Sequence, residues 1–128
     1  MSQFTTLKTR FTRLDFLKKA LNDLGLAWEE GDLMVRGFMG KTTPAQIRVS
    51  TRDPNYPIGF RRVGDTYEMV ADWYYVKEHT PESLLKALSR RYAYHAALAT
   101  LGAQNFSLVE EEVGPEEQVH LVLRRMVN

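Results

Sequence analysis

The sequence predicts an α+β fold, an antiparallel sheet of about six to seven strands with two helices on one face. Two segments, residues 14–24 and 81–102, have apolar residues at helical spacing, and most other segments have strand-like composition. Turn residues at 64–65 and 114–117 join neighbouring strands through short connections, which favour antiparallel pairing. A length of 128 residues and a hydrophobic content of 44% suit a single domain, residues 1–128, with one core.

The first helix follows a strand-like segment, residues 3–11, that is rich in threonine and phenylalanine. Its apolar face consists of leucines at steps of three and four residues, namely Leu14, Leu17, Leu21 and Leu24. Thr12 is predicted to cap the start of this helix, with Asp15 completing a capping box. Gly25 is predicted to end the helix in the left-handed conformation.

The next part of the chain reads as strands separated by turns. Trp28 begins a strand that the turn composition of Glu30–Asp32 is predicted to end. Residues 45–52 alternate apolar and polar side chains, which is typical of a half-buried strand. Residues 53–57, DPNYP, are dense in turn formers and are predicted to be a loop.

Two further strands, residues 58–63 and 66–76, are predicted to pair through a tight hairpin at Gly64. The second of them, TYEMVADWYYV, is interpreted as one continuous strand. Alternation along such a strand sends Trp73 to one face and Asp72 and Tyr74 to the other. The aromatic cluster therefore covers two surfaces, and at least part of it faces a helix or a partner.

The second helix begins at a strong local signal. Thr80 is predicted to cap it, Pro81 to occupy its first position, and Glu82 to lie in its first turn. Residues 92–103 are apolar nearly all round, which predicts burial on more than one side, within the fold or against a partner chain.

The two parts of the chain resemble each other, with a boundary between about 1–52 and 58–128. Each has a strand, a Thr-capped helix, a Gly stop and further strands, and the helices share LKKAL at 17–21 and LKAL at 85–88. This pattern favours a tandem βαββ repeat within one sheet.

Composition restricts the class of protein. The net charge is +1, no cysteine is present, and no apolar run approaches the length of a membrane span. A cytoplasmic location without membrane insertion is therefore expected, and nucleic-acid binding is disfavoured. The three histidines, His79, His95 and His120, lack metal-ligand spacing, so no metal site, cofactor or catalytic residue is assigned.

Basic side chains concentrate in residues 33–62, where Asp53 is the lone acidic residue. A shared face would give a patch for an anionic ligand, and the residues assigned to it are Arg36, Arg48, Arg61 and Arg62. The alternative is a solvated sheet face with local ion pairs, each of which contributes little. A third interpretation is RNA binding through strands 33–62, with aromatic stacking by Phe38, Tyr56, Phe60 and Trp73.

A second candidate surface combines the aromatic strand with the second helix. Its residues are Asp72, Trp73, Tyr74, Arg91, Tyr92, Tyr94, His95 and Leu98. Imidazole titrates near neutrality, so His95 beside a tyrosine and Asp72 has the chemistry of a general acid or base. The alternative is a structural histidine that hydrogen-bonds a neighbouring side chain or carbonyl.

Five segments in order resemble the conserved plastid open reading frame 35 family of cyanobacteria and algal plastids, a family of unknown function. They are FTTLKT near the start, VRGF at 35–38, YEMVADWYYV at 67–76, RRYAYH at 90–95 and LVEEEV at 108–113. Where the family pattern has Trp-Trp after Asp72, this chain has Trp73–Tyr74. The resemblance implies a small soluble protein of the cyanobacterial cytoplasm or plastid stroma, and it brings no activity, cofactor or catalytic residue. Family members tend to be encoded near a ferredoxin-like protein and an AAA-type ATPase, which implies an accessory component of a larger assembly.

The preferred hypothesis is a non-enzymatic adaptor that binds a protein partner, or a second copy of itself, through its aromatic and apolar surface. The alternative is a small enzyme or ligand-binding protein with its pocket between the sheet and the second helix, at His95, Tyr92, Tyr94, Arg91 and Asp72.

Overall fold

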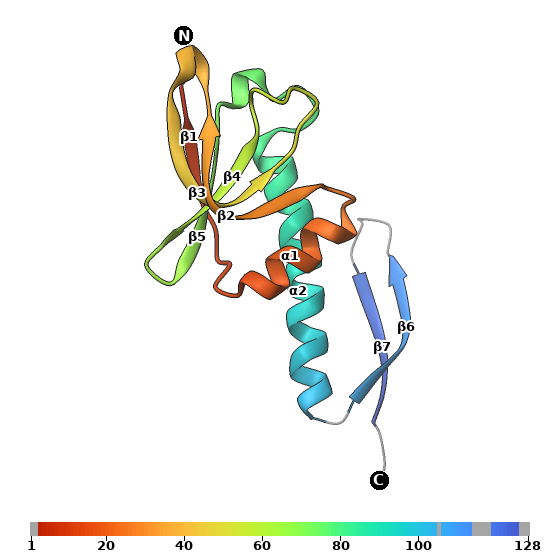
Figure 1. Ribbon diagram of the computed structural model, residues 1–128. Helices are drawn as coiled ribbons and strands as arrows, with labels where there is room; N and C mark the ends of the chain where they lie inside the picture. Colours follow the sequence, from red (N-terminus) through yellow and green to blue (C-terminus); the bar gives the residue numbers. More distant parts are fainter. Residues whose placement is uncertain (1–2, 105, 114–118, 126–128) are drawn as a thin grey trace.

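The computed structural model describes the backbone of residues 3–104, 106–113 and 119–125, and the side chains of residues 3–104. Five antiparallel strands form the main sheet in the order β1-β5-β4-β3-β2 (Figure 1). The strands are β1 Thr5–Lys8, β2 Trp28–Arg36, β3 Thr42–Val49, β4 Ile58–Val63 and β5 Thr66–Ala71. The helices are α1 Leu14–Asp23 and α2 Pro81–Ala103, and two single 3-10 turns are η1 Phe38–Gly40 and η2 Trp73–Tyr75.

The main sheet is smaller than predicted. The last two strands of the described chain, β6 Phe106–Val113 and β7 Val119–Arg125, pair only with each other, so a sheet of six to seven strands is not confirmed. The hairpin that they form lies beside the C-terminal half of α2 (Figure 1). The tandem βαββ repeat is not confirmed either, because the β2–β3 hairpin after α1 joins the main sheet and the β6–β7 hairpin after α2 does not.

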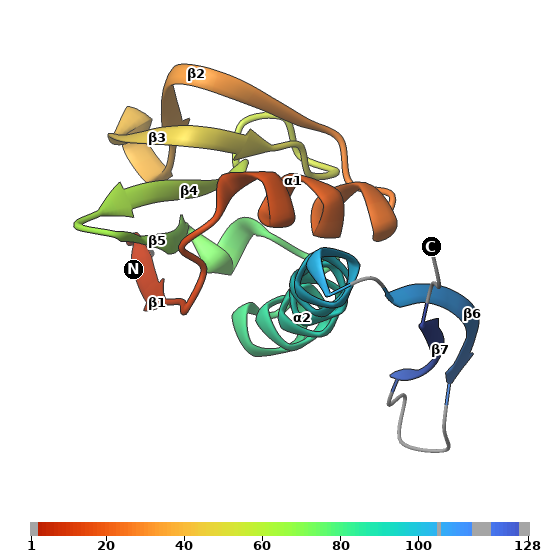
Figure 2. The ribbon, with the colours of Figure 1, turned by 90° about the horizontal axis from the view of Figure 1, so that it is seen from below.

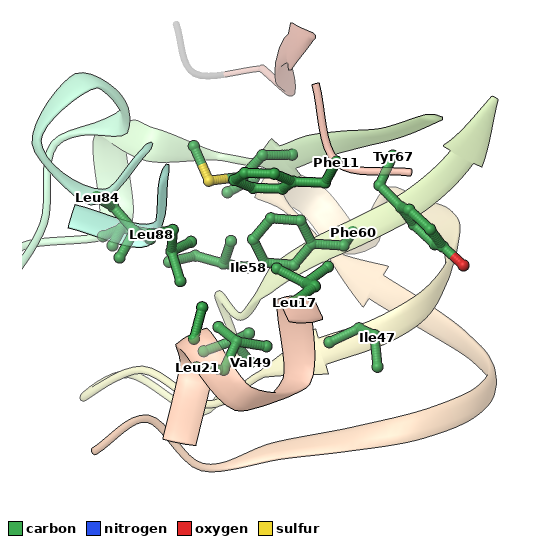
Figure 3. Close-up of a cluster of buried hydrophobic side chains, with 14 residues drawn as sticks. Phe11, Leu17, Leu21, Ile47, Val49, Ile58, Phe60, Tyr67, Leu84 and Leu88 are labelled. Atoms are coloured by element: carbon green, nitrogen blue, oxygen red, sulfur yellow. The ribbon is translucent and has the colours of Figure 1, made fainter. Parts of the chain in front are cut away.

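The core lies where both helices meet the sheet (Figure 2). Strand register places Ile47 beside Phe60 and Phe60 beside Met69, so these apolar side chains form a row toward the helices. The helices meet this row with Leu17 and Leu21 of α1 and with Leu84 and Leu88 of α2 (Figure 3). The α+β class and the apolar leucine face of the first helix are thereby confirmed.

Two of the predicted helix ends are confirmed. Gly25 has φ +70°, and its N–H donates to the carbonyl of Asn22 while the N–H of Leu26 donates to the carbonyl of Leu21. These two bonds form a Schellman motif, which glycine favours because it has no Cβ. At the start of α2, the Thr80 hydroxyl accepts the N–H of Ser83 at 3.2 Å, and the Ser83 side chain completes the capping box.

The turn predicted at Glu30–Asp32 is wrong, because β2 continues through these residues. Its register against β3 shifts between Glu30 and Leu33, and Gly31 has φ +154°, so the segment is a β-bulge. Glycine and acidic residues suit a bulge as well as a turn, and composition does not distinguish the two. The bulge keeps β2 and β3 paired as one long hairpin, up to the turn at η1.

Gly59 of β4 marks a close approach between strands. A Cβ at this position would lie well inside contact distance of Val35 Cγ2, 3.0 Å from the Cβ of Ala45 and 3.3 Å from Val70 Cγ1. Val35, Ala45 and Val70 are at most 1% exposed, so strands β2, β3 and β5 pack over a position that has no room for a side chain.

The strand predicted over residues 66–76 ends at Ala71. Trp73–Tyr75 instead form the 3-10 turn η2, and the N–H of Tyr75 donates to the carbonyl of Asp72 at 3.1 Å. Strand alternation therefore does not apply beyond Ala71. Trp73 is partly buried against the core, and Tyr74 is exposed.

Candidate functional site

The residues predicted as one aromatic and helical surface lie in two separate places. Asp72, Trp73 and Tyr74 belong to the turn after β5, where they meet η1. Tyr92, Arg91 and His95 lie along α2 and contact α1. Each group is therefore described by its own contacts.

Asp72 connects the two 3-10 turns. Its side chain is 1% exposed, and its Oδ2 accepts the backbone N–H of Phe38 in η1 at 3.0 Å. Its second oxygen, Oδ1, and the Nε1 of Trp73 are buried without a hydrogen-bond partner in the described part of the chain. Because unpaired buried polar atoms are rare, both atoms are suited to a hydrogen bond with a buried water molecule. Asp72 thus fixes η1 beside η2 and is not positioned to act on His95.

Aromatic rings from three loops stack above this connection. The ring of Tyr75 lies 4.1 Å from that of Tyr56 and 6.0 Å from that of Phe38, in both cases nearly parallel. Tyr74 packs edge-on against Tyr75 and is 68% exposed. Burial, reinforced by Tyr75, Asp53 and Asp72, raises the pKa of Tyr56. The neutral form of this tyrosine is therefore favoured in the stack.

Met39 extends the same region and is 81% exposed. Its φ is +57°, a conformation that non-glycine residues adopt infrequently and that holds the side chain at the tip of the β2–β3 hairpin. Met39 and the stacked aromatic residues are called the loop surface hereafter, and its members are Phe38, Met39, Tyr56, Tyr74 and Tyr75. Sequence reasoning missed Met39, because the left-handed turn that exposes it has no local signature.

On α2, Tyr92 has a structural role. Its hydroxyl oxygen accepts the backbone N–H groups of Thr12 and Arg13 at 3.1 and 2.9 Å. The N-cap of α1 is Arg13, which makes no side-chain capping bond, so the predicted Thr12 cap is wrong. A side chain from the second helix thus holds the segment that enters α1, at the N-cap and at the residue before it, and the Tyr92 ring stacks on Phe11 at 4.6 Å.

Replacing Tyr92 by phenylalanine is expected to lower the free energy of unfolding by about 1 kcal/mol, the usual effect of losing a hydrogen-bond acceptor for backbone N–H groups. The ring and its packing on Phe11 stay, so the change reports the two hydrogen bonds alone. Urea unfolding of purified protein measures the difference. Tyr74→Phe is the matched control, since that residue is largely exposed and its variant should stay within about 0.5 kcal/mol of wild type. Equal effects in both variants would contradict a stabilising role for the two hydrogen bonds to Tyr92.

A polar network ties the two helices together one turn further along. Asp23 Oδ2 of α1 accepts from Arg91 Nε at 2.8 Å and lies 2.6 Å from Nε2 of His95. Burial raises the pKa of the Asp23 carboxyl, but the hydrogen bonds and charges of Arg91 and His95 outweigh it, so the net pKa lies below its ordinary value. The Arg91 guanidinium also lies over the ring of Tyr94, 4.1 Å from its centre.

This network agrees with a structural histidine better than with a catalytic one. His95 is oriented by Asp23 of α1, and Asp72, its predicted partner, is bonded to Phe38 instead. Tyr94, Leu98 and Leu101 are only partly buried. This half of α2 is therefore less buried than predicted.

A hollow of about 390 Å³ borders α2 near Tyr92. Lys8, Arg10 and Phe11 line it from the N-terminal segment, and Leu85 and Ser89 line it from the helix. His95 does not line this hollow, so the hollow provides no pocket in which His95 would meet a substrate.

The four arginines assigned to an anionic-ligand patch occupy three environments. Arg61 donates to the Thr43 hydroxyl and to Glu68 at 3.0 and 3.2 Å, between strands. Arg62 donates to the carbonyl of Gly64 in the β4–β5 turn. Arg36 and Arg48 together line a hollow of about 490 Å³ between the β2–β3 hairpin and the loop after β3.

The aromatic residues assigned to RNA stacking are likewise divided. Phe60 is 0% exposed in the core and has no face available for a base. Phe38 and Tyr56 already stack on Tyr75. Across the residues with described side chains, no group of three or more His, Asp or Glu residues has the geometry of a metal site. No described helix is both long and apolar enough to cross a membrane.

Together these features define a class of protein. It is a small α+β protein with a five-stranded antiparallel sheet, an exposed loop surface of aromatic and methionine side chains, and a separate arginine-lined hollow. The chain belongs to the DUF1257 family, described as a protein family of unknown function, whose profile matches residues 20–122.

Relatives within this family cover the chain almost completely. The uncharacterized protein ycf35 of Guillardia theta is 36% identical over 126 residues, which is 98% of each chain. The uncharacterized protein ycf35 of Cyanophora paradoxa is 30% identical over the same share of both chains. The predicted resemblance to the open reading frame 35 family is thereby confirmed. No solved structure shows significant similarity to this chain.

Proposed function

We propose that the protein is a non-enzymatic adaptor that binds a protein partner through the loop surface. The observation that carries this proposal is the exposure of Met39 and Tyr74, at 81% and 68%, beside a preformed stack of aromatic rings. Exposed large apolar side chains that cluster on one surface mark interaction sites, and methionine and tyrosine are enriched at protein interfaces.

The way in which the loop surface is built supports the same role. Asp72 joins η1 to η2 from beneath, and Tyr56 reaches the stack from the loop after β3. Three loops are therefore held in one arrangement before a partner arrives. Such preorganisation lowers the entropy that ordering of the interface costs on binding.

The alternatives have weaker support. In the enzyme hypothesis His95 acts in a pocket, yet its ring is held by Asp23 and the hollow on α2 is lined by other residues. In the RNA hypothesis the arginines share a face, yet Arg61 and Arg62 make separate contacts within the sheet and its turn.

We place this role in the cytoplasm or the plastid stroma. The relatives in the comparison carry the name ycf35, and the family resemblance brings an AAA-type ATPase and a ferredoxin-like protein as the first partners to examine.

The experiment compares affinity capture by three purified versions of the protein. The double variant Met39→Ser/Tyr74→Ser removes the two most exposed apolar side chains of the loop surface. The control, Val63→Ser, removes an apolar side chain that is 47% exposed in the β4–β5 hairpin, at the opposite end of the strands. A partner captured by wild type and by the control is expected to be lost from the double variant. If the double variant retains every captured protein, or if the control loses the same ones, the proposal is wrong.

A further inference from the structure

The hollow beside Arg36 and Arg48 is separate from the contacts that define the loop surface. It measures about 490 Å³, within the range typical of small-molecule sites, and it opens between the β2–β3 hairpin and the loop after β3. Met34, Pro54 and Pro57 provide apolar walls, and Thr42 and Ser50 provide exposed hydroxyl groups. It therefore combines positive charge, hydroxyl donors and an apolar wall.

The two guanidinium groups differ in how far they are neutralised. Arg48 is fixed by the carbonyl of Met34 at 3.1 Å and paired with Glu29 at 3.0 Å. Arg36 donates instead to Asn55 Oδ1, a neutral acceptor, at a long 3.4 Å. Glu29 is the acidic residue among those that line the hollow, and its pairing with Arg48 leaves the charge of Arg36 in excess.

We propose that this hollow binds a small ligand that carries an oxyanion, a carboxylate or a phosphate group, on an apolar body. The planar fork of Arg36 donates two parallel N–H groups, which matches the oxygens of either anion. Arg48, held in place by its own partners, adds a second cation, and Thr42 and Ser50 add hydroxyl donors. The space exceeds that of a single oxyanion, so the body of the ligand lies against Met34, Pro54 and Pro57.

The site does not depend on the adaptor role. Its cations lie on β2 and β3, and the exposed members of the loop surface, Met39 and Tyr74, do not line it. Loss of ligand binding and loss of partner binding are therefore separable by variants at different positions.

The test titrates the full-length protein with inorganic phosphate, phenyl phosphate and benzoate, followed by nitrogen–proton correlation NMR. Saturable shifts are expected for the amides of Thr42, Ser50 and Thr51, which line the hollow. Phenyl phosphate is expected to bind several-fold more tightly than inorganic phosphate, because the ring buries apolar area against the wall. A comparison of phenyl phosphate with benzoate shows which oxyanion the site prefers.

Arg36→Gln is expected to weaken binding of the best probe by roughly tenfold or more, the usual cost of a lost charged hydrogen bond. Arg36→Lys keeps the charge without the fork and should fall between wild type and Arg36→Gln. Arg62→Gln is the matched control, with the same change in net charge at a site bonded to Gly64, and it should leave affinity unchanged.

Two results would overturn the proposal. One is the absence of saturable shifts in the hollow with all three probes at millimolar concentration. The other is equal weakening by Arg36→Gln and Arg62→Gln, which would indicate unspecific attraction by net charge.

Discussion

Replacement of Leu88 by alanine is expected to lower the free energy of unfolding by about 2–5 kcal/mol. Leu88 is 0% exposed and joins α2 to the same core cluster as Leu17, Leu21 and Phe60. Truncation removes buried methyl groups and leaves a cavity at the contact between helix and sheet, where packed strands on one side limit collapse. Urea or guanidinium unfolding, followed by far-ultraviolet circular dichroism, measures the loss.

The comparison variant is Leu98→Ala on the same helix. Leu98 is only partly buried and lies in the half of α2 that follows the core contact, so its truncation should cost roughly 1 kcal/mol or less. A Leu98 effect as large as that of Leu88 would mean that the second half of α2 contributes to the core as much as the first half.

Gly59→Ala is expected to destabilise the protein by about 1–3 kcal/mol or more, because the added methyl group meets packed atoms of Val35, Ala45 and Val70. A second substitution provides the decisive measurement. Val35→Ala removes the nearest obstructing methyl group, so the double variant should recover part of the loss and show a favourable coupling energy.

Gly102→Ala is the control for the loss of a glycine as such. This residue lies in α2 with nothing within 4 Å of the added Cβ, so alanine should leave stability unchanged or raise it by up to about 1 kcal/mol. If Gly59→Ala were as well tolerated as Gly102→Ala, the inference that β2, β3 and β5 leave no room for a side chain at position 59 would be wrong.

The parts of the fold that were predictable are those whose cause lies within a few residues. Thr80, Pro81 and Ser83 cap α2 through contacts inside one turn, and Gly25 ends α1 through its own φ angle. The hairpin at Gly64 is equally local, with φ +64° at the glycine and Val63 paired to Thr66.

The errors arose where distant residues decide the outcome. Thr12 has the composition of a cap, but the N-cap is Arg13, and the N–H groups of both residues donate to Tyr92 of the other helix. Trp73 continues the alternation of β5 in the sequence. In the structure, however, Asp72 accepts the N–H of Phe38, and the residues that follow it form the turn η2. The periodicity of a segment does not show whether the last two strands pair with the main sheet, because that pairing depends on tertiary contacts.

The candidate site was predictable in residue type but not in grouping. Asp72, Trp73 and Tyr74 were identified from their aromatic density, and Arg36 and Arg48 from the basic character of the middle strands. The structure places the first three at a turn that is bonded to η1, the turn that contains Met39, and the last two around a hollow. Arg61 does not line that hollow, because it pairs with Glu68 between strands, and this pairing depends on strand register rather than on composition.

The bonds that Thr12 and Arg13 donate to Tyr92 have a consequence for the order of folding. The N–H groups of the N-cap of α1 and of the residue before it bind a hydroxyl that lies 79 and 80 residues later in the chain. A chain emerging from the ribosome therefore has the entry of α1 unanchored until α2 has been made and docked. Anchoring this segment requires the closure of a large loop, which slows the step relative to a contact made within one turn. Pulsed hydrogen exchange during refolding, which would find the amides of Thr12 and Arg13 protected together with α2 and no earlier, tests this order.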